Sequence, residues 1–191
     1  MENLLLTEYN SLIHARVISQ FNKDLAQLSE ADCGGIIKAA KAYNEKLMNN
    51  PRRFYPTDSE TAEYHKILDF TGTGVIGALE IYAINVRLPI YLGTDKQTLK
   101  KGAGHLEGSY LPVGGLGTHS IICVHRGFPT STLLLNADRL VIGDTFTLKI
   151  LNEILTYKID HIAVVDPYDY KYLDIPQNSK SQEVEKTKRQ D

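Results

Sequence analysis

The stretch THSIICVHRGFPT, residues 118–130, joins an apolar run to a single histidine and then to a turn. The run SIICV (120–124) is apolar at successive positions, which is typical of a central strand covered on both faces. His125 follows the run, and Phe128-Pro129 ends it. Functional side chains are often presented at such strand ends, and an imidazole titrates near neutral pH. The stretch therefore predicts a buried strand that delivers one candidate acid–base residue, His125.

The chain before this run contains a helical region and a loop. Apolar residues recur near a 3.6-residue period through residues 1–48, and Ser29 with Asp32 supplies a capping signal for a second helix. An N-terminal helical hairpin is therefore expected over this range. Residues 49–73 carry prolines and polar residues without a steady period, which indicates a loop with one short helix near residues 61–68.

A β-rich body is expected over residues 74–176. Short segments of β-forming residues alternate there with Gly, Pro, Asn and Asp; the last strand is expected at 157–165, and short helices at 96–101 and 131–134. The fold class is therefore mainly β, with two N-terminal helices on a β-sheet or β-barrel. The polar residues 177–191 contain no aromatic side chain and are predicted to be disordered.

The composition excludes several classes of protein. With 191 residues, 42% hydrophobic and 23% charged, the chain has the character of one globular domain. A net charge of −2 gives no basic excess, so no nucleic-acid partner is expected. The two cysteines, Cys33 and Cys123, form no disulfide framework. We identify no signal peptide and no apolar run of the ~18 residues that span a bilayer, so the chain itself is expected to be soluble.

Cys123 is a second candidate for chemistry because it lies two positions before His125. Alternate residues of a strand share one face, with about 6.7 Å between their Cα atoms. A thiol and an imidazole on one face can form a nucleophilic pair, although this separation is long for a hydrogen bond. A cysteine within a buried strand, in contrast, commonly serves as a small apolar residue. Both interpretations of Cys123 remain open on the sequence.

Neither a metal nor a cofactor is expected. His105, Glu107, His119 and His125 carry donor atoms suited to zinc, but their spacing matches no metal-binding motif. The glycine-rich stretches GTGVIG and PVGGLG do not stand between a strand and a helix with the acidic residue that a dinucleotide site requires. We interpret both stretches as turns.

Three motifs follow one another around His125: GAGHLEG (102–108), LPVGG (111–115) and HRGFP (125–129). The stretch LEIYAINVRLPIYLGT precedes them, and LTYKIDHIAVVDP follows. In order and spacing, these motifs resemble those of the class C, pilus-assembling sortases of Gram-positive bacteria. The helical N-terminal region is similar to the helices of that family. The resemblance covers residues 4–175.

The resemblance implies a sortase-like β-barrel with a groove for an LPXTG-like sorting signal, carried by pilin subunits as partners. In that family a cysteine attacks the Thr–Gly peptide bond, a histidine transfers protons, and an arginine stabilises the oxyanion. A lysine amine of the next pilin then resolves the thioester. His125 matches the catalytic histidine. The full-length proteins work at the extracellular face of the cell membrane, held by anchors that do not occur in this sequence.

The same resemblance predicts an incomplete active site. The family carries its cysteine in a Thr-Leu-x-Thr-Cys motif on a later strand, and its arginine on the strand after that. This chain has no such motif and no cysteine after Cys123, and its only arginine beyond residue 167 is Arg189. Arg126 is expected to point away from the face of His125. We therefore expect a truncated, inactive transpeptidase with a barrel incomplete at the C-terminus; the alternative is a non-catalytic domain that binds sorting-signal peptides or pilin.

Two further expectations concern the rim of the groove. Class C sortases commonly insert an Asp-Pro-aromatic lid into the groove, but the loop here offers only FYP (54–56), and DPY (166–168) comes after the last expected strand. Without the neighbouring strand that carries the cysteine, residues 120–124 would leave an apolar edge unpaired. The isolated chain is then expected to be poorly soluble, to dimerise through that edge, or to depend on a missing segment.

Overall fold

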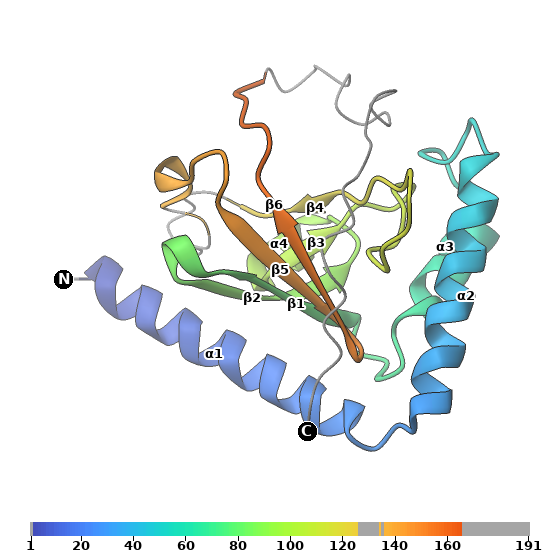
Figure 1. Cartoon of the computed structure of the whole chain (residues 1–191). Helices are drawn as coiled ribbons and strands as arrows, with labels where there is room; N and C mark the ends of the chain where they lie inside the picture. Colours follow the sequence, from blue (N-terminus) through green and yellow to red (C-terminus); the bar gives the residue numbers. More distant parts are fainter. Residues whose placement is uncertain (1, 126–133, 135, 166–191) are drawn as a thin grey trace.

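The computed structural model describes residues 2–125, 134 and 136–165. This part of the chain forms a curled sheet with long helices beside it (Figure 1). The helices are α1 (Glu2–Leu25), α2 (Glu30–Met48), α3 (Asp58–Ile67) and α4 (Lys96–Lys101), with short 3-10 turns η1 (Tyr82–Ile84) and η2 (Ala137–Arg139). The strands are β1 (Val75–Ile81), β2 (Val86–Leu92), β3 (Ala103–His105), β4 (Ile122–Cys123), β5 (Thr145–Ile150) and β6 (Glu153–Lys158).

The six strands form one sheet in the order β4-β3-β2-β1-β5-β6. Neighbouring strands are antiparallel except β2 and β3, which run parallel and are joined by α4. Asp95 begins that helix, as its side chain accepts hydrogen bonds from the backbone N–H groups of Gln97 and Thr98. β1 lies inside the sheet and is buried at every position, so both of its faces are covered.

The described strands do not close into a barrel. β4 and β6 are the two edges, and each pairs with one neighbour. The closed barrel that the resemblance implies is therefore replaced, over the described part of the chain, by an open, curled sheet (Figure 1). Residues 166–176 of the expected body and the tail 177–191 lie outside the described residues.

Over the described residues, the strand expected at 120–124 is shorter than predicted and lies at an edge of the sheet, which is the position expected for it in the absence of a neighbouring strand. β4 comprises two residues, both half-buried, and it lies at an edge of the sheet. It pairs with β3 through Cys123 opposite Gly104 and Ile122 opposite His105. A run that is apolar at successive positions needs partners on both sides to stay in a sheet. The described residues provide β4 with one of these partners, so the strand is short.

The last strand also ends earlier than predicted, at Lys158 instead of residue 165. Its final contacts are hydrogen bonds from Ile159 N–H to the Asp144 carbonyl at 2.7 Å and from Gly143 N–H to the Ile159 carbonyl at 2.8 Å. Residues 161–165 are exposed and have no regular structure. An alternating sequence alone does not form a strand where the sheet offers no further partner.

The two N-terminal helices diverge instead of forming a hairpin. α1 packs against β1 and β2, whereas α2 contacts α3, and Figure 1 shows α2 leading away from the end of α1. The predicted start of α2 is confirmed, because Asp32 N–H donates to Ser29 Oγ at 3.1 Å and Ser29 N–H donates to the Asp32 carboxylate at 3.0 Å. None of the described helices combines the length and apolar character needed to cross a bilayer.

The short helix expected near residues 61–68 is α3, which begins at Asp58. Its start is fixed by a capping box, in which Glu60 N–H donates to Thr57 Oγ1 and Thr57 N–H donates to the Glu60 carboxylate at 2.7 Å. The capping box places the beginning of α3 directly after the proline-containing turn at residues 50–56.

A buried carboxylate links three strands of the sheet. Glu80 on β1 is 4% exposed, and its oxygens lie 2.9 Å from Arg87 Nε on β2 and 2.9 Å from Lys149 Nζ on β5. Tyr82 donates a further hydrogen bond at 2.7 Å. Burial raises the pKa of this carboxyl, but the hydrogen bonds from Lys149 and Tyr82 and the two positive charges hold it below its ordinary value. Glu80 is therefore an ionised, partnered link within the sheet.

The open edge at β4 leads to a prediction about self-association. Because β4 is so short, an antiparallel pair of two copies would centre near Cys123 and bring the two Cα atoms within the range that a disulfide requires. We expect a concentration-dependent dimer in sedimentation velocity and a disulfide-linked dimer after mild oxidation. The cross-link should vanish in Cys123→Ser and persist in Cys33→Ser, the matched control for the other thiol. A monodisperse monomer at every concentration would contradict the prediction.

Candidate functional site

His125 lies two residues after the end of β4 and is half-buried, at an edge of the sheet that the described strands form. The sequence predicts a histidine at the end of an apolar strand, and the structure places His125 after a strand that is shorter than expected. The arginine after it, Arg126, lies outside the described residues.

Cys123 lies on β4, two positions before His125. Burial raises the pKa of the Cys123 thiol, which favours the protonated form. A cysteine nucleophile needs the opposite shift, because the thiolate is the reactive species. The environment of Cys123 therefore supports the interpretation of a small, partly buried apolar residue and not that of a nucleophile activated by His125.

The buried imidazole of His105 organises the segment between β3 and β4. Its Nε2 lies 2.8 Å from the Tyr110 carbonyl oxygen, and its Nδ1 lies 3.0 Å from the Tyr64 hydroxyl. A carbonyl can only accept, so the proton is on Nε2, and Nδ1 is free to accept from Tyr64. Burial, partly opposed by the hydrogen bond to the Tyr110 carbonyl, lowers the pKa of His105 to about 4. His105 is therefore a neutral, fully engaged core residue.

Ser109 connects His105 to the beginning of β4. Its hydroxyl donates to the Leu106 carbonyl at 2.7 Å, lies 3.1 Å from His105 Nε2, and accepts from Ile121 N–H at 3.1 Å. Leu106 N–H also donates to the Ile121 carbonyl at 2.9 Å. Both backbone groups of Ile121, the residue directly before β4, are thus hydrogen-bonded.

These contacts bear on whether His105 could bind a metal ion. Both ring nitrogens of His105 are used inside the protein, so this residue has no lone pair left for a metal. Within the described part of the chain, no three side chains of His, Cys, Asp or Glu are grouped closely enough to share a metal ion. His105, Glu107, His119 and His125 therefore do not form a described metal centre.

The turn at residues 50–55, in the region expected for a lid, packs against the segment between β3 and β4. The backbone of Arg53 and the ring of Phe54 lie against Gly108, whose φ of +89° and close surroundings leave no space for a side chain. The guanidinium of Arg53 lies 4.9 Å from the centre of the Phe54 ring and 5.5 Å from that of Tyr110. Tyr55, in contrast, is 77% exposed. The turn therefore reaches the segment before β4 through Arg53 and Phe54.

Helix α2 holds the LPVGG motif through one side chain. Asn44 is buried, its Nδ2 donates to the Leu111 carbonyl at 3.0 Å, and its Oδ1 accepts from Leu111 N–H at 2.7 Å. The amide thus satisfies both backbone groups of one residue, as a neighbouring strand would. This contact ties α2 to the segment that leads into β4.

Polar groups without partners gather in that segment. Four buried side-chain atoms have no hydrogen-bond partner among the described residues: Glu107 Oε1, Tyr110 Oη, His119 Nδ1 and Ser120 Oγ. Burial, followed by the charge of Arg53, lowers the pKa of His119. The segment from residue 107 to residue 120 therefore retains unused donors and acceptors near the edge that carries His125.

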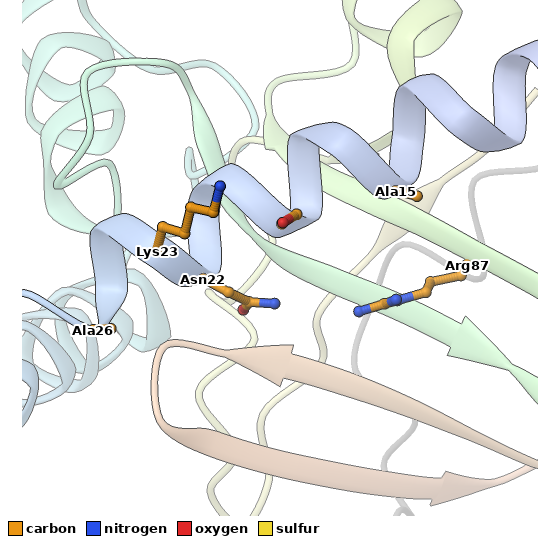
Figure 2. Close-up of a pocket in the computed structure, with 6 residues that line it drawn as sticks. Ala15, Asn22, Lys23, Ala26 and Arg87 are labelled. Carbon is orange, nitrogen blue, oxygen red and sulfur yellow. The ribbon is translucent and has the colours of Figure 1, made fainter.

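A separate groove of about 400 Å³ lies between α1 and β2 (Figure 2). Figure 2 shows Arg87 of β2 extending towards Asn22 of α1. The residues that line this groove are Ala15, Ser19, Asn22, Lys23, Ala26 and Arg87. None of them comes from β3, β4 or the segment between these strands, so the groove is distinct from the surroundings of His125.

The sequence does not indicate the buried roles of Tyr64, Asn44 and Ser109. A tyrosine or an asparagine in a helix has no local signal that distinguishes a buried hydrogen-bonding role from an exposed one. The hydrogen bonds of His105 are likewise not indicated, because contacts between residues distant in the chain cannot be read from spacing. The one available signal was the polar residues enclosed by the apolar positions of GAGHLEGSYLP.

Comparison with known proteins identifies the family. The family model described as "Sortase domain" matches residues 79–188. The chain belongs to the sortase family.

Solved structures similar to this chain include C-type sortases of two streptococci. Sortase C1 of Streptococcus agalactiae is 40% identical, with a TM-score of 0.79, and the match covers 83% of this chain and 82% of that one. Sortase C of Streptococcus pneumoniae is 37% identical, with a TM-score of 0.72, over 84% and 82% of the two chains. Sortase D of Bacillus subtilis is 36% identical over 93 residues, which is 49% of this chain and 44% of the Bacillus protein. The aligned part thus spans less than half of that relative.

The lowered pKa of His105 predicts acid sensitivity. The pKa is about 4 in the folded chain and 6.5 for the unperturbed group, so the unfolded state takes up the proton first as the pH falls below 6.5. The free energy of unfolding should then fall by about 2 kcal/mol between pH 7 and pH 5 through this residue alone. Urea unfolding at both pH values, compared with His105→Asn, measures the difference. An equal loss of stability in the variant would show that other groups cause the acid sensitivity.

Gly108 provides a test of how firmly the turn at residues 50–55 is seated. In Gly108→Ala, positive φ costs about 1–2 kcal/mol, and the clash with the Arg53 carbonyl adds to it or displaces the turn. Gly72→Ala is the matched control, because Gly72 has a φ of +70° and open space around it. We expect a greater loss of stability and faster tryptic cleavage after Arg52 or Arg53 in Gly108→Ala than in Gly72→Ala. Equal effects would mean that the turn is not held against Gly108.

Proposed function

We propose that this chain is a class C, pilin-polymerising sortase domain in which His125 is the acid–base residue. The observation that carries the proposal is the 40% identity to sortase C1 of Streptococcus agalactiae over 83% of this chain. The placement of His125 two residues after the end of an edge strand supports the role, since a side chain there can face a second strand across the edge.

The reaction proposed for the complete site joins a sorting signal to a lysine. A thiolate attacks the Thr–Gly carbonyl, and an arginine stabilises the negative charge on the oxygen. The C–N bond breaks as the imidazolium of His125 gives its proton to the leaving glycine amine. A lysine amine of the next pilin then attacks the thioester, its proton passes to the imidazole, and the thiolate is released.

We propose that the 191-residue chain alone does not catalyse this reaction. The sequence contains no Thr-Leu-x-Thr-Cys motif, and burial raises the pKa of Cys123, its one cysteine near His125. Binding without cleavage is the alternative function. It requires no nucleophile, in keeping with the absence of a Thr-Leu-x-Thr-Cys motif from these 191 residues.

A chimera tests the proposed role of His125. The strands of Streptococcus agalactiae sortase C1 that carry the nucleophile and the arginine would be fused after Val165, and cleavage of a fluorogenic LPXTG-like peptide would be followed. We expect no cleavage by the 191-residue chain and measurable cleavage by the chimera. His125→Ala should lower the rate of the chimera about 100-fold or more, whereas Cys123→Ala should leave it unchanged.

Two outcomes would contradict this assignment. If the 191-residue chain forms a thioester with the peptide and Cys123→Ala abolishes it, Cys123 is the nucleophile. If the chimera cleaves equally well without the imidazole of residue 125, that residue is not the acid–base group. Peptide binding by the unfused chain, without cleavage, would support the non-catalytic alternative, and a Thr-Leu-x-Thr-Cys sequence downstream of codon 191 would support the catalytic one.

A further inference from the structure

We propose that Ser109, held by the buried pair Tyr64 and His105, is the positioning residue that fixes the orientation of His125. The inference rests on the proposed function, because it takes His125 as the acid–base residue. It concerns three side chains that lie in the interior of the protein and that the proposed chemistry does not use.

The first step is the weakness of β4 as a strand. Its pairing with β3 extends over Cys123 and Ile122 only, so the ladder fixes few backbone dihedrals next to His125. Four residues separate Ile121 from His125, a length of about 13 Å in an extended chain. A small rotation at Ile121 is therefore amplified at the imidazole. A displacement of about 1 Å in a catalytic group can reduce a rate on the order of 100-fold.

The second step is that Ser109 fixes Ile121, the first residue of the segment from 121 to 125. Its hydroxyl accepts from Ile121 N–H at 3.1 Å and donates to the Leu106 carbonyl at 2.7 Å. Since Leu106 N–H donates in turn to the Ile121 carbonyl, one hydroxyl closes a ring of three hydrogen bonds across the base of β4. Ser109 is 2% exposed, so water does not readily replace the hydroxyl.

The third step is that the core fixes Ser109. His105 Nε2 lies 3.1 Å from its hydroxyl, and the imidazole cannot turn without losing the Tyr110 carbonyl or the Tyr64 hydroxyl. Tyr64 is fully buried in α3, and its oxygen also accepts from Gly93 N–H at 2.9 Å. The orientation of the serine is therefore set by α3 and by the residue after β2, away from the β4 edge of the sheet.

The alternative is that the three side chains only satisfy buried polar groups. In that case, removal of one hydroxyl lowers stability but leaves the surroundings of His125 as they were. If Ser109 positions His125, its removal must also alter the surroundings of the His125 imidazole, four positions after Ile121. The two explanations therefore differ in a spectroscopic property of His125 and not in the stability of the chain.

NMR spectroscopy of the full 191-residue chain makes the distinction. In Ser109→Ala, we expect amide exchange of Ile121 to become about fivefold faster or more, together with a shift of the His125 imidazole resonances. Thr156→Ala is the matched control, because it removes a hydroxyl from β6 at the other edge of the sheet. Neither quantity should change in that variant.

Tyr64→Phe tests the same series of hydrogen bonds at Tyr64, the residue farthest from His125. It provides the deciding measurement if Ser109→Ala does not fold. It keeps the ring but removes the hydroxyl that orients His105, so the His125 resonances should shift in the same direction. Faster exchange at Ile121 with unchanged His125 resonances would overturn the proposal, as would equal shifts in Thr156→Ala. These readouts need no substrate, so a failure to bind or cleave sorting peptides would refute the proposed function and leave this result standing.

Discussion

The hydrogen bond from His105 Nε2 to the Tyr110 carbonyl is the constraint on which the region around β4 depends. It sets the tautomer, and the tautomer leaves a lone pair on Nδ1 beside the Tyr64 hydroxyl, which also lies 2.9 Å from the His105 carbonyl oxygen. In the other tautomer, a lone pair on Nε2 would face the Tyr110 carbonyl oxygen at 2.8 Å inside the core. One carbonyl oxygen thus determines how α3, β3 and the segment before β4 fit together.

The sheet is well determined at its centre and open at its edges. β1 pairs with β2 and β5 and is joined to both of them by the charges around Glu80, whereas β4 has one short ladder. His125 lies at the less constrained edge, where a second reacting group can approach it. The acid–base role proposed for His125 requires such access, because the imidazole would have to meet both a leaving amine and an incoming one.

The sequence was a good guide where structure follows from local pattern. The capping signal of Ser29 and Asp32, helix α4 and the strands β1, β2 and β5 were predictable, because caps, turns and β-forming residues act within a few positions. The length of β4 and the divergence of α1 and α2 were not, since both depend on partners distant in the chain. The motif around His125 indicated the candidate residue. The hydrogen bond between His105 and Tyr64 was not predictable, because the two residues lie 41 positions apart in the chain.

The amide of Asn44 makes α2 a structural partner of the segment before β4, although this helix lies outside the sheet. By occupying both backbone groups of Leu111, it makes α2 behave like an additional strand for that residue. A shortened domain that began at α3 would leave the Leu111 N–H and C=O without partners in an apolar environment. Helix α2 is consequently an integral part of the folding unit.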